Sequence, residues 1–157
     1  MIVVADTSPI CYLLLINCIE LLPQLYNQVL IPQAVQQELA DRRSPMVVRD
    51  WINQPPGWLV IQTVSPLGLD ELDNLDPGER AAIMLAEQQG ADLVVIDERL
   101  GRQVAVSRGL RVTGVLGVLD EAARQNLVDF SEVIARLQQT SFRANSALIQ
   151  SLLQQHL

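Results

Sequence analysis

Residues 2–6 read Ile-Val-Val-Ala-Asp, and residues 93–97 read Leu-Val-Val-Ile-Asp. Each stretch is an apolar, mostly β-branched run that ends on an aspartate, which is typical of a strand buried on both faces of a parallel sheet. Ligands of open α/β sheets bind at the carboxyl ends of the strands. The pattern therefore predicts that Asp6 and Asp97 lie at a binding edge, and that they share one cleft if their strands are neighbours.

Further strands and helices alternate along the chain. The other expected strands are at 29–31, 58–64 and 111–113. Helices are expected at about 9–26 (with a break near Asn17), 32–40, 45–53, 76–90, 98–108, 114–125, 129–139 and 145–155. Ser8 is expected to cap the first helix, with Pro9 at its first position. The alternation predicts one three-layer α/β/α domain over residues 1–157, with a mainly parallel central sheet and a helical C-terminus.

The composition narrows the function classes. The 157 residues carry a net charge of −7, which argues against strong non-specific nucleic-acid binding but leaves room for an acidic metal site with a basic rim. All eleven basic residues are arginine, which suits phosphate contacts, although a bias in composition explains this more simply. No apolar run reaches the ~20 residues of a membrane span and no basic leader precedes residue 2, so a soluble cytoplasmic protein is expected.

Cysteine and histidine are too few for several kinds of site. Cys11 and Cys18 fall about 10 Å apart along an expected helix, which is too far for a disulfide. The single histidine, His156, stands next to the C-terminus. A His-based triad or a His/Cys zinc site is therefore not expected, and carboxylates must carry any catalysis.

Four acids stand out: Asp6, Glu38, Glu79 and Asp97. Each also has a structural interpretation: Asp6 and Asp97 can cap the helices that follow them, Glu38 can be solvated, and Glu79 stands at capping-box spacing from Asp76. Together they are more informative, because all four can face the carboxyl edge of a parallel sheet, where helix N-termini tolerate carboxylates. Such a cluster predicts a Mg²⁺ or Mn²⁺ site that activates a water.

Four blocks of sequence resemble one known superfamily. They are Val-Val-Ala-Asp-Thr-Ser-Pro at 3–9, Ile-Pro-Gln-Ala-Val-Gln-Gln-Glu at 31–38, Leu-Asp-Pro-Gly-Glu-Arg-Ala-Ala-Ile at 75–83 and Asp-Leu-Val-Val-Ile-Asp-Glu at 92–98. Their order and spacing resemble PIN-domain proteins, a superfamily of metal-dependent ribonucleases that includes the VapC-like toxins. Thr-Gly-Val-Leu-Gly-Val-Leu at 113–119 is similar to a less characterised prokaryotic branch with a longer helical C-terminus.

The resemblance implies a function and a set of residues. It puts Asp6, Glu38, Glu79 and Asp97 on the catalytic acids that bind Mg²⁺ or Mn²⁺, and it implies RNA as substrate. Thr7 or Ser8 would hold a phosphate or a water at the metal. It also implies an antitoxin protein as a partner if the chain is the toxin of a toxin–antitoxin pair, and a homo-oligomer, since related proteins commonly dimerise.

Arg102 is predicted to contact phosphate, because it lies near Asp97 and on the same helical face as Arg99. The competing interpretation is a helix-surface arginine that pairs with Glu98 or Glu87.

Two departures from the family pattern leave a second hypothesis open. Many active members carry Asp where this chain has Glu79, and Thr or Ser where it has Val95. The alternative is a weakly active or inactive PIN-like module that binds nucleic acid or protein.

Overall fold

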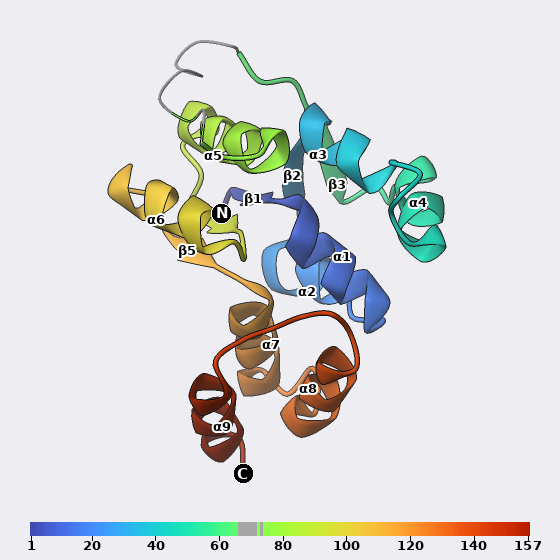
Figure 1. Ribbon diagram of the computed structural model, residues 1–157, viewed down its shortest axis with the longest axis vertical. Coiled ribbons are helices and arrows are strands. Elements are labelled where there is room, and N and C mark those ends of the chain that lie inside the picture. The colour runs from blue at the N-terminus through green and yellow to red at the C-terminus, as the bar shows by residue number, and fades with distance from the viewer. Residues whose placement is uncertain (66–71, 73) are drawn as a thin grey trace.

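The central sheet of the computed structural model has five parallel strands (Figure 1). The structure describes residues 1–65, 72 and 74–157. The strands are β1 (Val3–Ala5), β2 (Val29–Pro32), β3 (Leu59–Gln62), β4 (Leu93–Val95) and β5 (Val112–Thr113), in the order β3-β2-β1-β4-β5. Every neighbouring pair is parallel, so the prediction of a mainly parallel sheet is confirmed.

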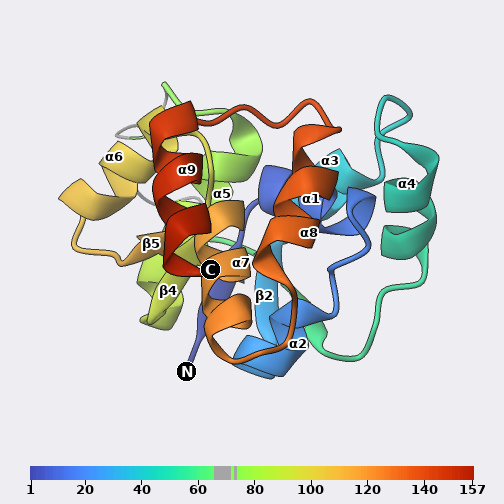
Figure 2. The same cartoon turned by 90° about the horizontal axis from the view of Figure 1, so that it is seen from below.

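Helices cover both faces of this sheet (Figure 2). They are α1 (Thr7–Leu15), α2 (Leu21–Tyr26), α3 (Gln33–Leu39), α4 (Met46–Asn53), α5 (Pro77–Gln89), α6 (Arg99–Ser107), α7 (Val115–Arg124), α8 (Phe130–Gln138) and α9 (Ser146–Gln155). Successive side chains of a strand point to opposite faces. Val3 and Ala5 accordingly join the core of α1, α2, α7 and α8, whereas Val4 joins the core of α5 and α6. The three-layer α/β/α prediction is confirmed.

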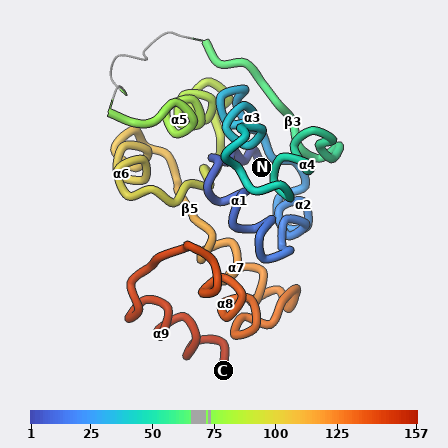
Figure 3. Tube along the Cα trace, turned by 45° about the vertical axis from the view of Figure 1, so that its right-hand side comes forward, coloured from blue at the N-terminus to red at the C-terminus, as the bar shows by residue number. Residues whose placement is uncertain are grey.

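The helical C-terminus gathers at one end of the molecule, where α7, α8 and α9 pack together (Figures 1 and 3). Ile134 of α8 and Ile149 of α9 are buried in the same cluster as Val3 of β1. His156 stacks on Phe130 and lies 2.7 Å from Asp120 Oδ1, which ties the end of α9 to α7 and α8. No helix in the described part of the chain is long and apolar enough to cross a membrane.

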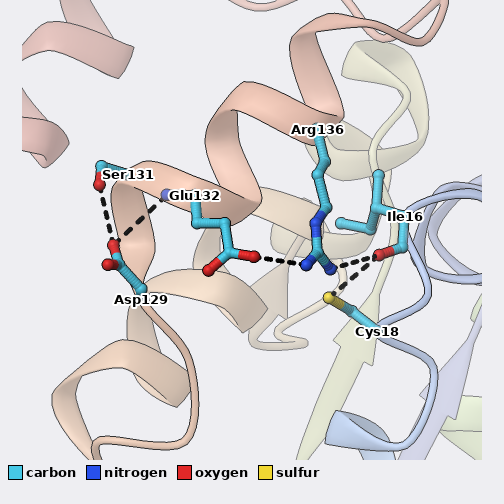
Figure 4. A network of polar contacts seen from close by, with 6 residues as sticks. All are labelled: Ile16, Cys18, Asp129, Ser131, Glu132 and Arg136. Atoms are coloured by element: carbon cyan, nitrogen blue, oxygen red, sulfur yellow. Dashed lines mark hydrogen bonds and ion pairs between the residues drawn. The ribbon is translucent and has the colours of Figure 1, made fainter.

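A polar network joins this end to the N-terminal half (Figure 4). Arg136 Nη1 donates to the Ile16 carbonyl at 3.3 Å, and the Cys18 thiol donates to the same oxygen at 3.5 Å. Arg136 also bonds Glu132, one turn earlier in α8. The arginine therefore satisfies a carbonyl that the end of α1 leaves without an intrahelical partner.

Local details of the first helix differ from the prediction. Helix α1 begins at Thr7, with Asp6 rather than Ser8 at the N-cap position, because the chain turns into the helix directly after β1. The expected break is present: Asn17 has φ 60°, a left-handed value that asparagine tolerates. Cys18 consequently lies outside both helices, although it and Cys11 are free as expected. The loop or turn expected at 65–75 lies largely outside the described residues.

Candidate metal and nucleic-acid site

The two strands that end on aspartate are neighbours. Strands β1 and β4 pair in parallel, with Ala5 opposite Val95. The Asp6 backbone N–H donates to the Val95 carbonyl at 2.9 Å, which carries the pairing one residue beyond β1. Asp6 and Asp97 therefore leave the sheet at the same edge, as their sequence pattern predicts.

Asp6 is a buried carboxylate with little to neutralise it. The residue is 3% exposed, and Oδ1 has no hydrogen-bond partner among the described residues. Burial raises the pKa of Asp6 to about 7; the neighbouring Thr7 backbone N–H opposes the rise, and the negative charges of nearby acids add to it. Although Asp6 stands at the N-cap position of α1, its side chain makes no capping bond. The capping interpretation of Asp6 is therefore wrong.

Glu38, near the end of α3, reaches toward the start of α1. Thr7 Oγ1 donates to Glu38 Oε1 at 2.8 Å, while Glu38 Oε2 is buried without a partner in the described part of the chain. Burial raises the pKa of Glu38, and the charge of Asp76 raises it further. The Thr7 hydroxyl, predicted to hold phosphate or water, thus orients an acid. Glu38 is not the simple solvated side chain of the structural interpretation.

Glu79 and Asp76 both lie at the start of α5. The sequence did not reveal that Asp76 belongs to the acidic cluster. The Glu79 backbone N–H donates to Asp76 Oδ1 at 2.8 Å, so the predicted cap is present. Burial, followed by a hydrogen bond to the Asp76 carboxyl, raises the pKa of Glu79. Because Asp76 also acts on Asp6 and Glu38, it is a fifth member of the acidic group. The sequence feature that could have identified Asp76 is its position at the start of the same helix as Glu79.

Asp97 caps a different helix from the one expected. Its carboxylate accepts from the Val115 backbone N–H, at 3.1 Å to Oδ1 and 3.3 Å to Oδ2, at the start of α7. The N-cap residue of α6 is instead Glu98, without a side-chain bond. Burial raises the pKa of Asp97 to about 6, although the bond from Val115 and the charge of Arg102 oppose the rise.

Arg102 lies beside this second aspartate. Its Nη1 donates to the Ile96 carbonyl at 2.8 Å, at the end of β4. The competing interpretation, a pairing of Arg102 with Glu98 or Glu87, is not seen among the described residues, where Glu87 bonds Arg108 instead. Ser8, the other predicted phosphate contact, lines a groove together with Asp97 and Arg102. Both predicted contacts therefore stand next to the edge where Asp97 lies.

Three glycines leave room for three of the acids. A methyl group at Gly78 would overlap the Glu38 carboxylate, and one at Gly114 would overlap Asp97. At Gly101 it would come within 2.6 Å of Glu79 Oε2. The close approach of helix backbone to each carboxylate thus depends on residues without a side chain.

The donors at this edge suit a hard divalent cation. They are carboxylate oxygens that repel one another, and Asp6 Oδ1 and Glu38 Oε2 are buried without partners among the described residues. Mg²⁺ prefers such oxygen ligands. No three His, Cys, Asp or Glu side chains in the described ranges already form a ligand group.

Comparison with known proteins gives the family. A family model described as a PIN domain matches residues 2–156. No curated protein matches the sequence. PIN domains are generally dependent on divalent metals, and the family indicates a nuclease-type function and binding of nucleic acid. The match covers the strands, the acids and the helical C-terminus described above, and on this basis the chain belongs to the PIN-domain family.

Proposed function

We propose that this chain is a divalent-metal-dependent ribonuclease that hydrolyses RNA phosphodiesters at Asp6, Glu38, Glu79 and Asp97. The observation that carries the proposal is the unpartnered Asp6 Oδ1: its burial, and to a smaller extent the neighbouring negative charges, raise the pKa of the Asp6 carboxyl to about 7. Strongly perturbed acids in one place favour a functional site over a structural one. The family adds the expectation of a nuclease.

The acids would have distinct roles. Asp6 and Asp97, at the ends of adjacent strands, are proposed as direct ligands of Mg²⁺ or Mn²⁺, and Glu38 and Glu79 as ligands directly or through water. The bound ion would supply an activated water and stabilise charge on the leaving oxygen. Thr7 fixes the Glu38 carboxylate through its 2.8 Å hydrogen bond, and Arg102 places a positive charge beside Asp97.

The test is Asp6→Asn, which keeps the size of the side chain and removes its charge. The variant should lose Mn²⁺-dependent cleavage of single-stranded RNA and keep its fold, as judged by circular dichroism. Asp92→Asn is the matched control, because Asp92 lies at the opposite end of β4, where it accepts from the Ile2 N–H at 2.6 Å. The control should cleave like the parent. A parent chain that cleaves no RNA with any divalent ion would contradict the proposal.

Calorimetry with Mn²⁺ separates the proposal from the alternative of an inactive binding module. The proposal predicts that the parent binds Mn²⁺ and Asp6→Asn does not. Val95, buried without a hydroxyl beside the last acid, is what favours the alternative. The toxin role stays a prediction, tested by growth arrest on induction of the parent but not of Asp6→Asn.

A further inference from the structure

We propose that a groove running from Asp97 beneath residues 141–145 is the track for a single strand of RNA. The proposal deepens the proposed function and rests on it only for the part played by Asp97. It also assigns a purpose to the helical C-terminus, because the segment that joins α8 to α9 forms one wall of the groove.

The groove is large and continuous with the acidic edge. Its volume is 1070 Å³, and its lining begins at Ser8 and Asp97. Residues of α6 form one wall, and the segment at 141–145 with α9 forms the other. That segment crosses from α8 to α9 past the start of α7 (Figure 1). Pockets for drug-sized molecules measure roughly 300–1,000 Å³, so this groove has room for more than one nucleotide.

Three arginines give the groove the charge that a phosphate backbone requires. Arg102 is held beside Asp97 by its bond to the Ile96 carbonyl. On the opposite wall, Arg143 Nη1 donates to the carbonyls of Thr140 and Phe142, which leaves Nε and Nη2 without partners among the described residues. Exposed Arg99 makes no ion pair or hydrogen bond within the described ranges. The planar guanidinium group of arginine can donate two parallel hydrogen bonds to the oxygens of one phosphate.

Three carboxylates also line the groove, but they offset its positive charge only in part. Asp120 is already engaged by Arg124 at 3.0 Å and by His156 at 2.7 Å. Asp97 and Glu98 are the other carboxylates of the lining, and Asp97 lies at the acidic end of the groove beside Arg102. A groove with three arginines on a chain of net charge −7 is therefore a local feature, complementary to a polyanion.

Two aromatic rings point to unpaired bases. Tyr12 and Phe142 both line the groove and meet edge to face, with ring centroids 5.2 Å apart. The Tyr12 hydroxyl lies 3.1 Å from Ser141 Oγ, which fixes the ring against the crossing segment. Both residues pack against the main hydrophobic core but are only half-buried, so part of each remains accessible. Unstacked bases of single strands stack on such rings, whereas paired bases are not available to them.

Binding is best measured in the Asp6→Asn background, where bound RNA is not cleaved. The probe is a fluorescein-labelled single-stranded RNA of mixed sequence, followed by anisotropy. Arg99→Gln/Arg143→Gln should weaken binding at least roughly tenfold. It should also lower the slope of log K against log salt by about 1.4, about 0.7 for each phosphate that the protein no longer neutralises. Phe142→Leu, which keeps an apolar side chain, should weaken binding roughly tenfold.

The matched control is Arg42→Gln/Arg43→Gln, which removes two positive charges from exposed residues between α3 and α4, outside the groove. It should bind RNA like the background protein. An equal loss in both double variants would mean that net charge alone governs binding, and would overturn the track. Equal affinity for a duplex of the same length, or unchanged binding by Arg99→Gln/Arg143→Gln, would overturn it as well.

The two proposals fail in different ways. If the parent cleaves RNA with Mn²⁺ but Arg99→Gln/Arg143→Gln keeps the parent KM, the track is wrong and the nuclease stands. If the double variant loses RNA binding but the parent cleaves nothing, the nuclease is wrong and the track stands.

Discussion

The pKa values of the acids at the edge of the sheet shift in the opposite direction to those of two acids in surface turns. Asp41 accepts from the Arg43 N–H at 2.8 Å and from its guanidinium at 3.0 Å, and these bonds lower the pKa of Asp41 to about 2. Asp129 accepts from Ser131 and Glu132, which lowers the pKa of its carboxyl as well (Figure 4). Asp6, in contrast, is buried beside other acids and its pKa is raised to about 7. The surface acids are placed where they stabilise the fold, and the edge acids where they do not. Acids that are kept in positions where they destabilise the fold are typical of functional sites.

The largest expected effect is on stability against pH in metal-free protein. The pKa of Asp6 rises from 3.8 in the unfolded chain to about 7 in the folded one, so the folded chain holds this proton more tightly. The resulting stabilisation is present below about pH 4 and is lost as the pH rises toward 7, on the order of 4 kcal/mol for three pKa units. Urea unfolding in EDTA across this range measures it.

Asp6→Asn removes the carboxyl group that causes this change of stability with pH. The variant should be more stable than the parent near neutral pH, and the two should converge in acid. A parent that grows more stable between about pH 4 and pH 7 would contradict the opposition between edge and surface acids.

A divalent ion should offset the same repulsion. Mg²⁺ or Mn²⁺ at about 100 times its Kd stabilises the folded state by about 2.7 kcal/mol, which raises the Tm of a chain of this size by roughly 5–10 °C. Differential scanning fluorimetry measures the shift. Asp6→Asn should lose most of it, and Asp92→Asn should keep it. The same shift in both variants would place the ion elsewhere.

Gly78→Ala sharpens the comparison because it moves an acid without changing any charge. The added methyl group would overlap the end of the Glu38 side chain, which must swing aside. Activity or metal affinity should fall roughly 10–100-fold, as for other residues that orient ligands. Stability should hold or rise, since alanine suits a helix better than glycine.

Gly57→Ala is the control for this glycine, because a methyl group there would have no heavy atom within 4 Å. It should leave both activity and stability unchanged. Full activity in Gly78→Ala would mean that the position of the Glu38 carboxylate is unimportant.

The smallest effect is expected at the surface. Asp41→Asn removes the ion pair with Arg43, whose side chain is 91% exposed. The lowered pKa of Asp41 means that its contribution is present above about pH 4 and is lost as the pH falls toward 2. Thermal unfolding at neutral pH should therefore barely change. A loss as large as the effects at Asp6 would remove the distinction between the two groups of acids.

The sequence was most informative where a feature is local. Each run that ends on Asp6 or Asp97 contains one strand, so its burial on both faces and its place at the sheet edge could be predicted from alternation with helices. The cap of α5 by Asp76 could likewise be predicted, because Asp76 and Glu79 are only three residues apart in the sequence. Ser8 failed as a cap because the position of a helix start depends on the sheet that it leaves, not on the local residues alone.

Features made by distant segments could not be predicted. The influence of Asp76 on Asp6 and Glu38 depends on how α5 and α3 approach β1. Asp97 caps α7 rather than α6 because the end of β4 and the start of α7 meet in space. The groove needs residues as far apart as Tyr12 and Phe142.

The order in which a ribosome makes this chain gives the helical C-terminus another consequence. Val3 of β1 is made well before Ile134 and Ile149, with which it shares its core. Arg136 likewise reaches the Ile16 carbonyl only after α8 has been made. Until α8 and α9 emerge, β1 lacks part of its cover and the edge that holds Asp6 is unfinished. The site that we propose to cleave RNA is therefore completed only after α8 and α9 have been made.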